Sequence, residues 1–250
     1  KIYITFGEHD MSENIIHLVL ARIEGAPKGN KGVSLFIVPK FLTNDSTNET
    51  KRNDLKCIGL EKKLGIHASP TCVMSFGEKD KAKGYLLGQE NNGLACMFTM
   101  MNNARLNVGM QGVGIAERAL QQAIIYARER KQGKDYNNNE SISVAIIKHP
   151  DVSKMLLRMK TLTEAARALC YDNAIAIDLS ESHPSKIVRE RYKLKADLLT
   201  PVSKSWSTDI GVEVASLGIQ VHGGMGFIEE TGVAQYFRDS RIAPIYEGTN

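Results

Sequence analysis

The sequence lacks the features that mark several large classes of protein. Its four cysteines show no C-x-x-C spacing and stand among apolar residues, which predicts buried, reduced thiols and argues against a disulfide framework or a zinc site. No apolar run reaches the roughly 20 residues that a membrane-spanning helix needs. No signal peptide is recognisable at the start of the sequence. These absences predict an intracellular protein.

Charge is not concentrated in any segment either. The 250 residues include 32 Lys and Arg against 28 Asp and Glu, and the net charge of +4 is scattered along the chain, so the sequence predicts no nucleic-acid partner and no anionic membrane partner. His9, His17, His67 and His183 have no spacing suited to a metal site, and we predict that they are surface or turn residues. With 42% hydrophobic and 24% charged residues, the composition is that of a globular chain of one or two domains.

Residues 1–86 have the composition of antiparallel β-structure. Short segments rich in β-branched and aromatic residues are separated by Gly, Pro, Asn or Asp, and they cover residues 2–5, 15–21, 33–38 and 71–76. Residues 43–53 contain almost no apolar side chain, which predicts an exposed loop. We therefore predict a partial β-domain over residues 1–86.

From about Gly88 the apolar residues recur at the three- and four-residue steps of a helix. The predicted helices cover residues 88–133, 150–179 and 185–217. Pro201 falls inside the last of them and predicts a kink or a bend. Three long antiparallel helices, with a fourth outside the given sequence, would form an up-and-down bundle. The predicted fold class is α+β and predominantly helical: an antiparallel β-domain, followed over residues 87–250 by a helical bundle domain whose final helix is missing.

The last thirty residues carry the motifs that indicate chemistry. Residues 220–227 read Gln-Val-His-Gly-Gly-Met-Gly-Phe, and such glycines let a ligand approach backbone N–H groups that can hold an anion. A plain connection between helices is the alternative for this turn. Residues 241–250 read Arg-Ile-Ala-Pro-Ile-Tyr-Glu-Gly-Thr-Asn and present one carboxylate, Glu247, between an aromatic ring and a glycine. An exposed loop carboxylate is the alternative for Glu247, but the two motifs together indicate a site.

Together these motifs resemble the C-terminal signature of the acyl-CoA dehydrogenase family. The resemblance implies an FAD-dependent enzyme that oxidises an acyl-CoA thioester to the trans-2-enoyl-CoA, as in fatty acid β-oxidation. It implies that Glu247 is the base that takes the proton from Cα, while a hydride leaves Cβ for N5 of the flavin. A carboxylate is a weak base in water, but apolar surroundings disfavour its charged form and make it a stronger one.

The resemblance extends along the whole chain and implies a set of cofactor-binding residues. They are Tyr3, Thr5, Arg130, Gln220, Gly223, Gly224 and Thr249. Tyr3 lies in a segment similar to the strand beside the flavin, where the family more often has Trp. Arg130 and the glycine turn match residues that reach the FAD of a neighbouring subunit, and guanidinium geometry suits a pyrophosphate. A helix C-terminal residue favoured by the helix dipole is the alternative role of Arg130.

Substrate contacts are implied for Asn30, Asn102, Arg105 and Gly248. The family often has an aspartate at the position of Asn102, which leaves that contact open. Some relatives take their base from the position before the arginine. Here that position is Ala104, which cannot accept a proton, so the resemblance leaves Glu247 as the base.

The resemblance also implies partners and a setting. They are acyl-CoA as substrate, electron transfer flavoprotein as electron acceptor, a homodimer or homotetramer, and the cytoplasm of a bacterium or the mitochondrial matrix of a eukaryote. Residues 7–11 and 97–106 resemble the larger members, which carry an extra C-terminal domain, and because the chain begins at Lys1 and stops after the Glu247 motif, we expect a piece of a longer protein. Two alternatives stay open. An acyl-CoA oxidase would use the same carboxylate and FAD but react with oxygen, and a non-catalytic interaction protein of this fold would be expected to lose Glu247.

Overall fold

The computed structural model describes residues 2–43, 50–79, 81–134 and 142–250. The contacts within the chain divide it into two compact units, Lys1–Met101 and Asn102–Asn250. The boundary falls inside a long helix, α1 (Gly93–Glu129), whose first residue packs tightly on the backbone of Ser34 and Leu35 in the first unit. The predicted domain boundary between residues 86 and 87 stays a prediction.

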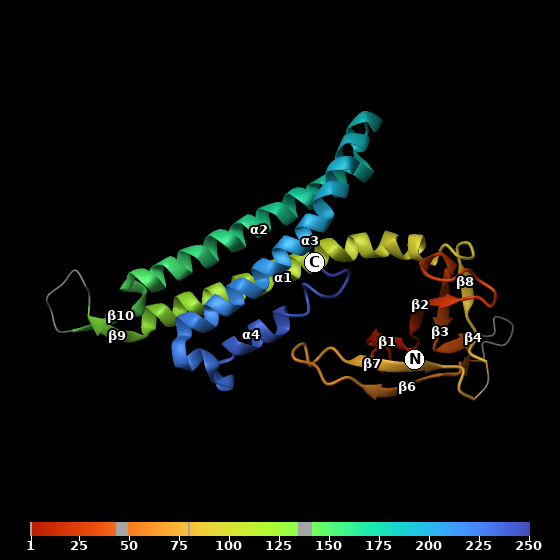
Figure 1. Cartoon of the computed structure of the whole chain (residues 1–250), viewed down its shortest axis with the longest axis horizontal. Helices are drawn as coiled ribbons and strands as arrows, with labels where there is room; N and C mark the ends of the chain where they lie inside the picture. The colour runs from red at the N-terminus through yellow and green to blue at the C-terminus, as the bar shows by residue number, and fades with distance from the viewer. Residues whose placement is uncertain (1, 44–49, 80, 135–141) are drawn as a thin grey trace. The chain divides into compact units, whose positions relative to one another are not determined.

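Short antiparallel strands build the first unit (Figure 1). They are β1 (Ile2–Thr5), β2 (Ile16–Arg22), β3 (Val33–Pro39), β4 (Phe41–Thr43), β5 (Thr50–Arg52), β6 (Leu55–Leu60), β7 (Thr71–Phe76) and β8 (Tyr85–Leu87). In the described residues of this unit the strands form three sheets, with strand orders β1-β7-β6, β2-β3-β8 and β4-β5. The four predicted strands are confirmed within one residue at each end. The loop predicted over residues 43–53 is wrong for Thr50–Arg52, which pair with Phe41–Thr43, and residues 44–49 lie outside the described part.

Alternation of side chains leaves one face of β1 exposed. The core of this unit contains Val19, Val38, Leu55, Cys72 and Met74. Ile4 packs against that core, so Tyr3 and Thr5 point to the opposite face and are exposed. The prediction for His17 was wrong: it is buried in β2, and its ring lies edge-on to Phe76. The same alternation explains this, because His17 shares the inner face of β2 with Val19.

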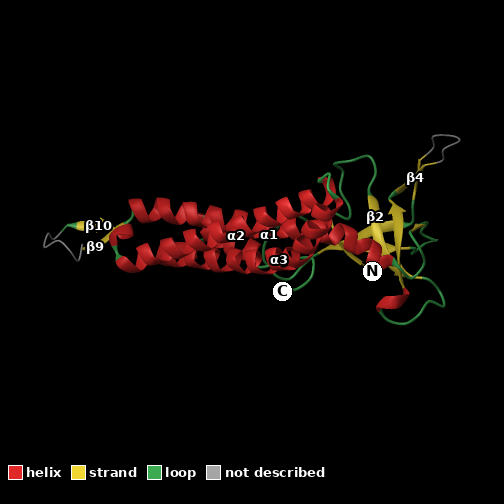
Figure 2. Ribbon diagram, turned by 90° about the horizontal axis from the view of Figure 1, so that it is seen from above, coloured by secondary structure: helices red, strands yellow, loops and turns green. Residues whose placement is uncertain are grey.

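Long helices form the second unit, and Figure 2 shows α1, α2 and α3 side by side. After α1 come β9 (Lys131–Lys134), β10 (Ser143–Ala145), a 3-10 turn η2 (Ile146–Lys148), α2 (Pro150–Ser182), α3 (Lys186–His222), the 3-10 turns η3 (Gly223–Phe227) and η4 (Glu229–Thr231), and α4 (Val233–Ser240). The predicted end of α3 at Leu217 is five residues too early, so Gln220 belongs to its last turn. Pro201 lies inside α3, which continues through it.

Small residues let α1 and α3 approach closely. A Cβ on Gly112 would lie 2.3 Å from the backbone oxygen of Ser207, and a Cβ on Gly211 would lie 2.9 Å from Cα of Gly112. A shared core follows from this approach, with Val113, Ala116, Leu120, Leu156, Met159, Cys170, Ile210 and Val214 buried between the three helices. The glycines therefore fix which residues of α1 face which residues of α3.

The predicted fold class, α+β and predominantly helical, is confirmed. No helix in the described residues combines the length and the apolar character needed to cross a membrane. All four cysteines are free thiols. Cys72 and Cys170 are buried as predicted, whereas Cys57 and Cys96 are partly exposed.

Candidate functional site

Glu247 lies in a loop that closes on itself after α4. The backbone N–H of Asn250 donates to the oxygen of Pro244 at 3.0 Å. Within the loop Glu247 has φ of 55° and Gly248 has φ of 98°, and the left-handed region is unusual for a residue with a Cβ. Such strain costs about 1 to 3 kcal/mol and persists only where the surroundings fix it. The half-buried carboxylate of Glu247 is thus carried by a constrained loop.

Helix α1 fixes this loop from one side. Nε of Arg105 donates to the backbone oxygen of Glu247 at 3.3 Å, and Nη1 of Arg105 donates to Oδ1 of Asn102 at 3.3 Å. The hydroxyl of Tyr246 donates to Oε1 of Gln111. Burial raises the pKa of Tyr246, as does the negative charge of Glu247, although the hydrogen bond to Gln111 opposes them. Tyr246 therefore stays a neutral donor at physiological pH.

Helix α3 fixes the loop from the other side. Nζ of Lys204 donates to the backbone oxygen of Gly248 and, at 2.9 Å, to Oδ1 of Asn250. The side-chain nitrogen of Asn250 lies 2.8 to 3.0 Å from three acceptors on α3: Ser205 O, Thr208 Oγ1 and Asp209 Oδ1. Lys204 is only 4% exposed. Burial lowers its pKa, an effect opposed by the charges of Asp209 and Glu247.

The glycine turn lies at the end of α3. Gln220, Gly223 and Gly224 are exposed, and Gly223 has φ of 58°. A Cβ on Gly223 or on Gly224 would meet no atom within 4 Å. It would instead fill the open space in front of the turn, which a ligand must enter to reach the backbone N–H groups. This open glycine turn fits an anionic group such as a pyrophosphate.

Arg130 lies at the same end of the bundle as the glycine turn. The ring of the buried His222 stacks on Tyr126 at 4.4 Å between centroids, and Nδ1 of His222 lies 2.7 Å from the oxygen of Gly218. This contact joins the end of α3 to the last turns of α1. Arg130 follows four residues after Tyr126 and is exposed. It is therefore available to an anionic ligand, alongside the turn.

Within one chain these two groups of residues are far apart. Arg105 contacts the Glu247 loop, whereas Arg130 lies by the glycine turn. The 25 positions that separate them correspond to about 38 Å at 1.5 Å per residue. The structure thus brings Asn102, Arg105 and Gly248 together with Glu247, and Gln220, Gly223 and Gly224 together with Arg130. Thr249 is exposed in the Glu247 loop.

The remaining predicted residues belong to the first unit. Tyr3 and Thr5 lie on the exposed face of β1, where Tyr3 is 67% exposed. Asn30 opens the 3-10 turn η1 (Asn30–Gly32) and is also exposed. An exposed aromatic ring and a hydroxyl two residues apart on one strand face suit contact with a flat, polar-edged ligand such as a flavin.

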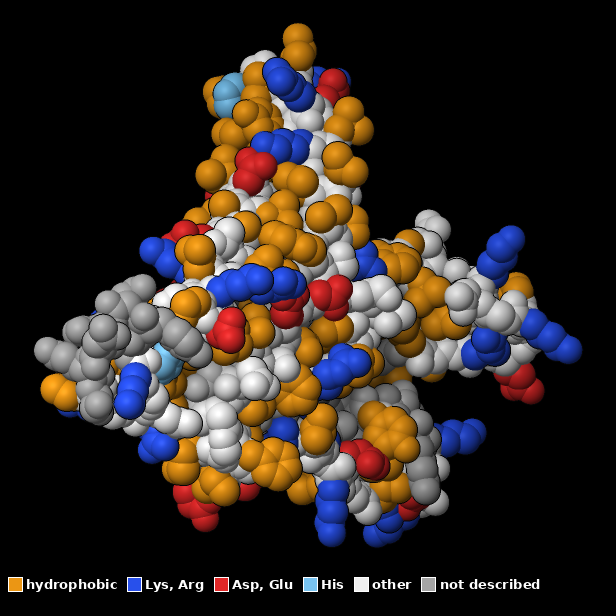
Figure 3. All heavy atoms as spheres, turned by 60° about the vertical axis from the view of Figure 1, so that its left-hand side comes forward, with side chains coloured by type: hydrophobic (Ala, Val, Ile, Leu, Met, Phe, Trp, Pro, Cys, Tyr) orange, Lys and Arg blue, Asp and Glu red, His pale blue; other side chains and the backbone are white. Residues whose placement is uncertain are grey.

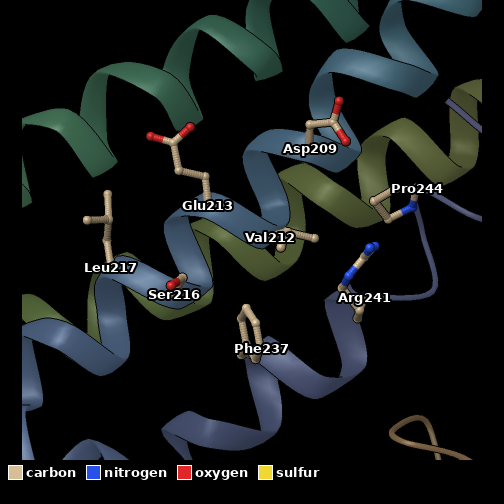
Figure 4. A pocket seen from close by; sticks show the side chains of 8 residues that line it. All are labelled: Asp209, Val212, Glu213, Ser216, Leu217, Phe237, Arg241 and Pro244. Carbon is tan, nitrogen blue, oxygen red and sulfur yellow. The ribbon is translucent and has the colours of Figure 1, made fainter.

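A pocket of about 470 Å³ lies between α3 and α4, and in Figure 4 Phe237 and Arg241 point from the α4 side toward α3. Its lining comprises Asp209, Val212, Glu213, Ser216, Leu217, Phe237, Arg241 and Pro244. Glu247 does not line it. The pocket shares Asp209 with the contacts of Asn250, so it borders the Glu247 loop on the α3 side.

Sequence reasoning missed three residues that hold the loop: Gln111, Lys204 and Asn250. A signal existed for Lys204, because it falls at helical spacing among the buried positions Thr200, Thr208 and Gly211 of α3. A lysine on a buried stripe needs partners. The sequence could not show that the partners would be Gly248 and Asn250.

Comparisons of the sequence and of the structure with known proteins both find acyl-CoA dehydrogenases. Residues 91–250 match the family model of the acyl-CoA dehydrogenase C-terminal domain. The whole chain is 55% identical over 249 residues to 3-methylmercaptopropionyl-CoA dehydrogenase of Ruegeria pomeroyi and spans 42% of it. Butyryl-CoA dehydrogenase of Megasphaera elsdenii matches with a TM-score of 0.75 at 29% identity, over all of this chain and 56% of its own. A Caenorhabditis elegans protein in complex with C11-CoA matches with a TM-score of 0.78 at 28% identity, over 94% of this chain and 37% of its own.

Proposed function

The chain belongs to the acyl-CoA dehydrogenase family, and we propose that it carries the catalytic base of an FAD-dependent enzyme that oxidises an acyl-CoA thioester to the trans-2-enoyl-CoA. One observation carries the proposal: the Glu247 carboxylate sits on a strained loop that α1 and α3 fix from two sides. An exposed carboxylate without a catalytic role would need no hydrogen bonds from two helices to hold its backbone in place. The relatives, of which the chain spans about half or less, supply the substrate class.

In this proposal Glu247 takes a proton from Cα of the acyl group as the Cα–H bond breaks. When bound, FAD supplies the acceptor for the hydride that leaves Cβ, and the Cα–Cβ double bond forms. Ala104, next to Arg105 on α1, has no group that could accept the proton instead. Gly248 has no side chain and leaves room beside Glu247 for the acyl chain. The chain's own contribution is a base held in position where the substrate and the cofactor exclude water.

The residues present fit FAD in two places. At one end of the bundle, the guanidinium of Arg130 and the backbone of Gly223 and Gly224 would bind the pyrophosphate. On the first unit, Tyr3 and Thr5 would contact the flavin ring, for which the exposed face of β1 offers an aromatic surface and a hydroxyl.

These groups support a homodimer or homotetramer in which subunits share each cofactor. Arg130 lies about 38 Å along the α1 direction from Arg105 and the Glu247 loop, much farther than the pyrophosphate of one FAD lies from its flavin ring. One chain's Arg130 would therefore serve a neighbour's FAD. Exposed apolar side chains cover the ends of α2 and α3 that meet near residue 184 (Figure 3). They include Tyr171, Ile175, Ile187, Leu194 and Leu198, and such surfaces mark sites of association.

We expect Arg130→Ala in the full-length protein to lower FAD affinity about tenfold or more, because charge-assisted hydrogen bonds contribute about 1.5 to 3 kcal/mol. The rate of flavin reduction per bound FAD should change little. FAD content after gel filtration, with sedimentation of the same samples, measures both the affinity and the assembly. Arg128→Ala, on a different side of α1, is the matched control. A wild-type holoenzyme that sediments as a monomer with all of its FAD would contradict shared cofactor sites.

Anaerobic bleaching of the flavin tests the proposed function directly. Butyryl-CoA, 3-methylmercaptopropionyl-CoA and a C11 acyl-CoA form a suitable panel, because the relatives are named for or bound to these acyl groups. At least one should bleach the full-length flavoprotein. The reduced enzyme should then be reoxidised by electron transfer flavoprotein, whereas rapid reoxidation by air would indicate an oxidase. If no acyl-CoA bleaches a fully loaded flavoprotein, the proposed activity is wrong.

A further inference from the structure

We propose that Lys204 and Asn250 form a clamp from α3 that positions the Glu247 carboxylate for proton abstraction. The inference rests on the function proposed above and adds two positioning residues to it. Neither needs to touch the substrate, since both act through the backbone of the loop.

Lys204 is hydrogen-bonded to the loop at the residue directly after Glu247. Its Nζ donates to the backbone oxygen of Gly248, the next residue, and to Oδ1 of Asn250 at 2.9 Å. The cation is 4% exposed, and burying a charge is costly unless it is paired and hydrogen-bonded. An apolar side chain at this position on the buried stripe of α3 would avoid that cost. The hydrogen bonds of Lys204 to Gly248 and Asn250 therefore explain why a lysine occupies this buried position.

Asn250 completes the clamp at the far end of the loop. Its side-chain nitrogen reaches three acceptors on α3 at 2.8 to 3.0 Å. Its backbone N–H returns to Pro244 and closes the loop over residues 244–250. Glu247 lies at the middle of that closed loop with φ of 55°. Because the strained conformation needs support from outside the loop, release of either side of the clamp should let it relax.

The clamp also places a positive charge near the base. The charged and titratable groups that face Lys204 are Asp209 on its own helix, Arg105 on α1, and Glu247 with its neighbour Tyr246 in the loop. A cation near a carboxylate favours its ionised form. Replacing Lys204 with Met therefore removes this charge together with the hydrogen bond to the loop.

The test uses the full-length holoenzyme in four variants: Lys204→Met, Asn250→Ala, the double variant and, as a surface control on the same helix, Lys195→Met. We expect Lys204→Met to slow anaerobic flavin reduction about 10- to 100-fold, because misplacement of about 1 Å can cost that much. Acyl-CoA affinity should stay close to that of the wild type. The double variant should be no slower than Lys204→Met alone. Hydrogen exchange over residues 244–250 should be faster in both single variants, and the control should match the wild type.

Wild-type rates in Lys204→Met and Asn250→Ala would overturn the clamp, and so would losses that multiply in the double variant. If Lys204→Met fails to fold, Asn250→Ala decides, because Asn250 is exposed and its loss disturbs no core. Failure of the proposed function gives a different result. In that case the flavin of the Glu247→Gln variant is reduced at the wild-type rate. If Glu247→Gln is slow but the Lys204 and Asn250 variants are reduced at the wild-type rate, the clamp alone is wrong.

Discussion

Replacing Glu247 with Gln should slow flavin reduction by acyl-CoA about 10²- to 10⁴-fold, the range that positioned general bases contribute. Glutamine keeps the size of the side chain and its hydrogen-bonding reach, but it cannot accept the α-proton. FAD and acyl-CoA should still bind, because neither the glycine turn nor Arg130 is altered. Stopped-flow absorbance of the flavin under anaerobic conditions measures the rate of reduction. The final absorbance of the same trace gives the extent of bleaching.

The control for this variant is Glu181→Gln, which makes the same change at an exposed carboxylate near the end of α2. It should reduce at the wild-type rate. No second base is available at position 104 on α1, because alanine cannot accept a proton. We therefore expect no recovery of the rate in Glu247→Gln from that position. Rapid bleaching of the Glu247→Gln variant by a good substrate would show that another group takes the proton.

Local patterns predicted the elements because local forces decide them. β-Branched and aromatic residues between turn residues placed β1, β2, β3 and β7, but β6 and β8 were missed. Three- and four-residue spacing placed α1, α2 and α3, although the first predicted helix extended past Glu129 into β9. The predicted end of α3 was too early: Gly218, a residue type that often ends a helix, follows Leu217, but in the structure it is buried within α3, which continues to His222. Thr50–Arg52 escaped prediction for another reason. All three residues are exposed, so no apolar period marks them.

The candidate site was predictable as a set of motifs but not as an arrangement. Gly248 and the glycines at 223 and 224 indicated turns, and the resemblance attached roles to them. The contacts that support Glu247 come from Arg105, Gln111 and Lys204, which are separated from it by about 40 to 140 residues. Such pairings depend on how α1 and α3 pack, and no local pattern encodes them. The left-handed backbone of Glu247 is likewise a product of that support, since its residue type does not favour it.

The packing of α1 against α3 depends on Gly112, and we expect Gly112→Ala to be strongly destabilising. Its Cβ would lie 2.3 Å from the backbone oxygen of Ser207, so one helix must move. Overpacking of this kind costs about 1 to 3 kcal/mol or more, and the better helix propensity of Ala returns at most about 1 kcal/mol. A net loss of about 2 kcal/mol would lower the melting temperature by about 4 to 8 °C for a chain of this size. Thermal unfolding followed by circular dichroism measures the shift.

Gly114→Ala provides the matched control, because it lies two residues further along α1 and a Cβ there meets no atom within 4 Å. That variant should be as stable as the wild type or slightly more stable, by up to about 1 kcal/mol. The two alanines also separate packing from function. Gln111, which accepts the hydrogen bond of Tyr246, directly precedes Gly112, so a displaced α1 should slow flavin reduction in Gly112→Ala and leave it unchanged in Gly114→Ala. Equal melting temperatures for the two variants would show that the close approach of α1 and α3 at Gly112 does not limit stability. Equal rates of flavin reduction would show that it does not control the position of the Glu247 loop.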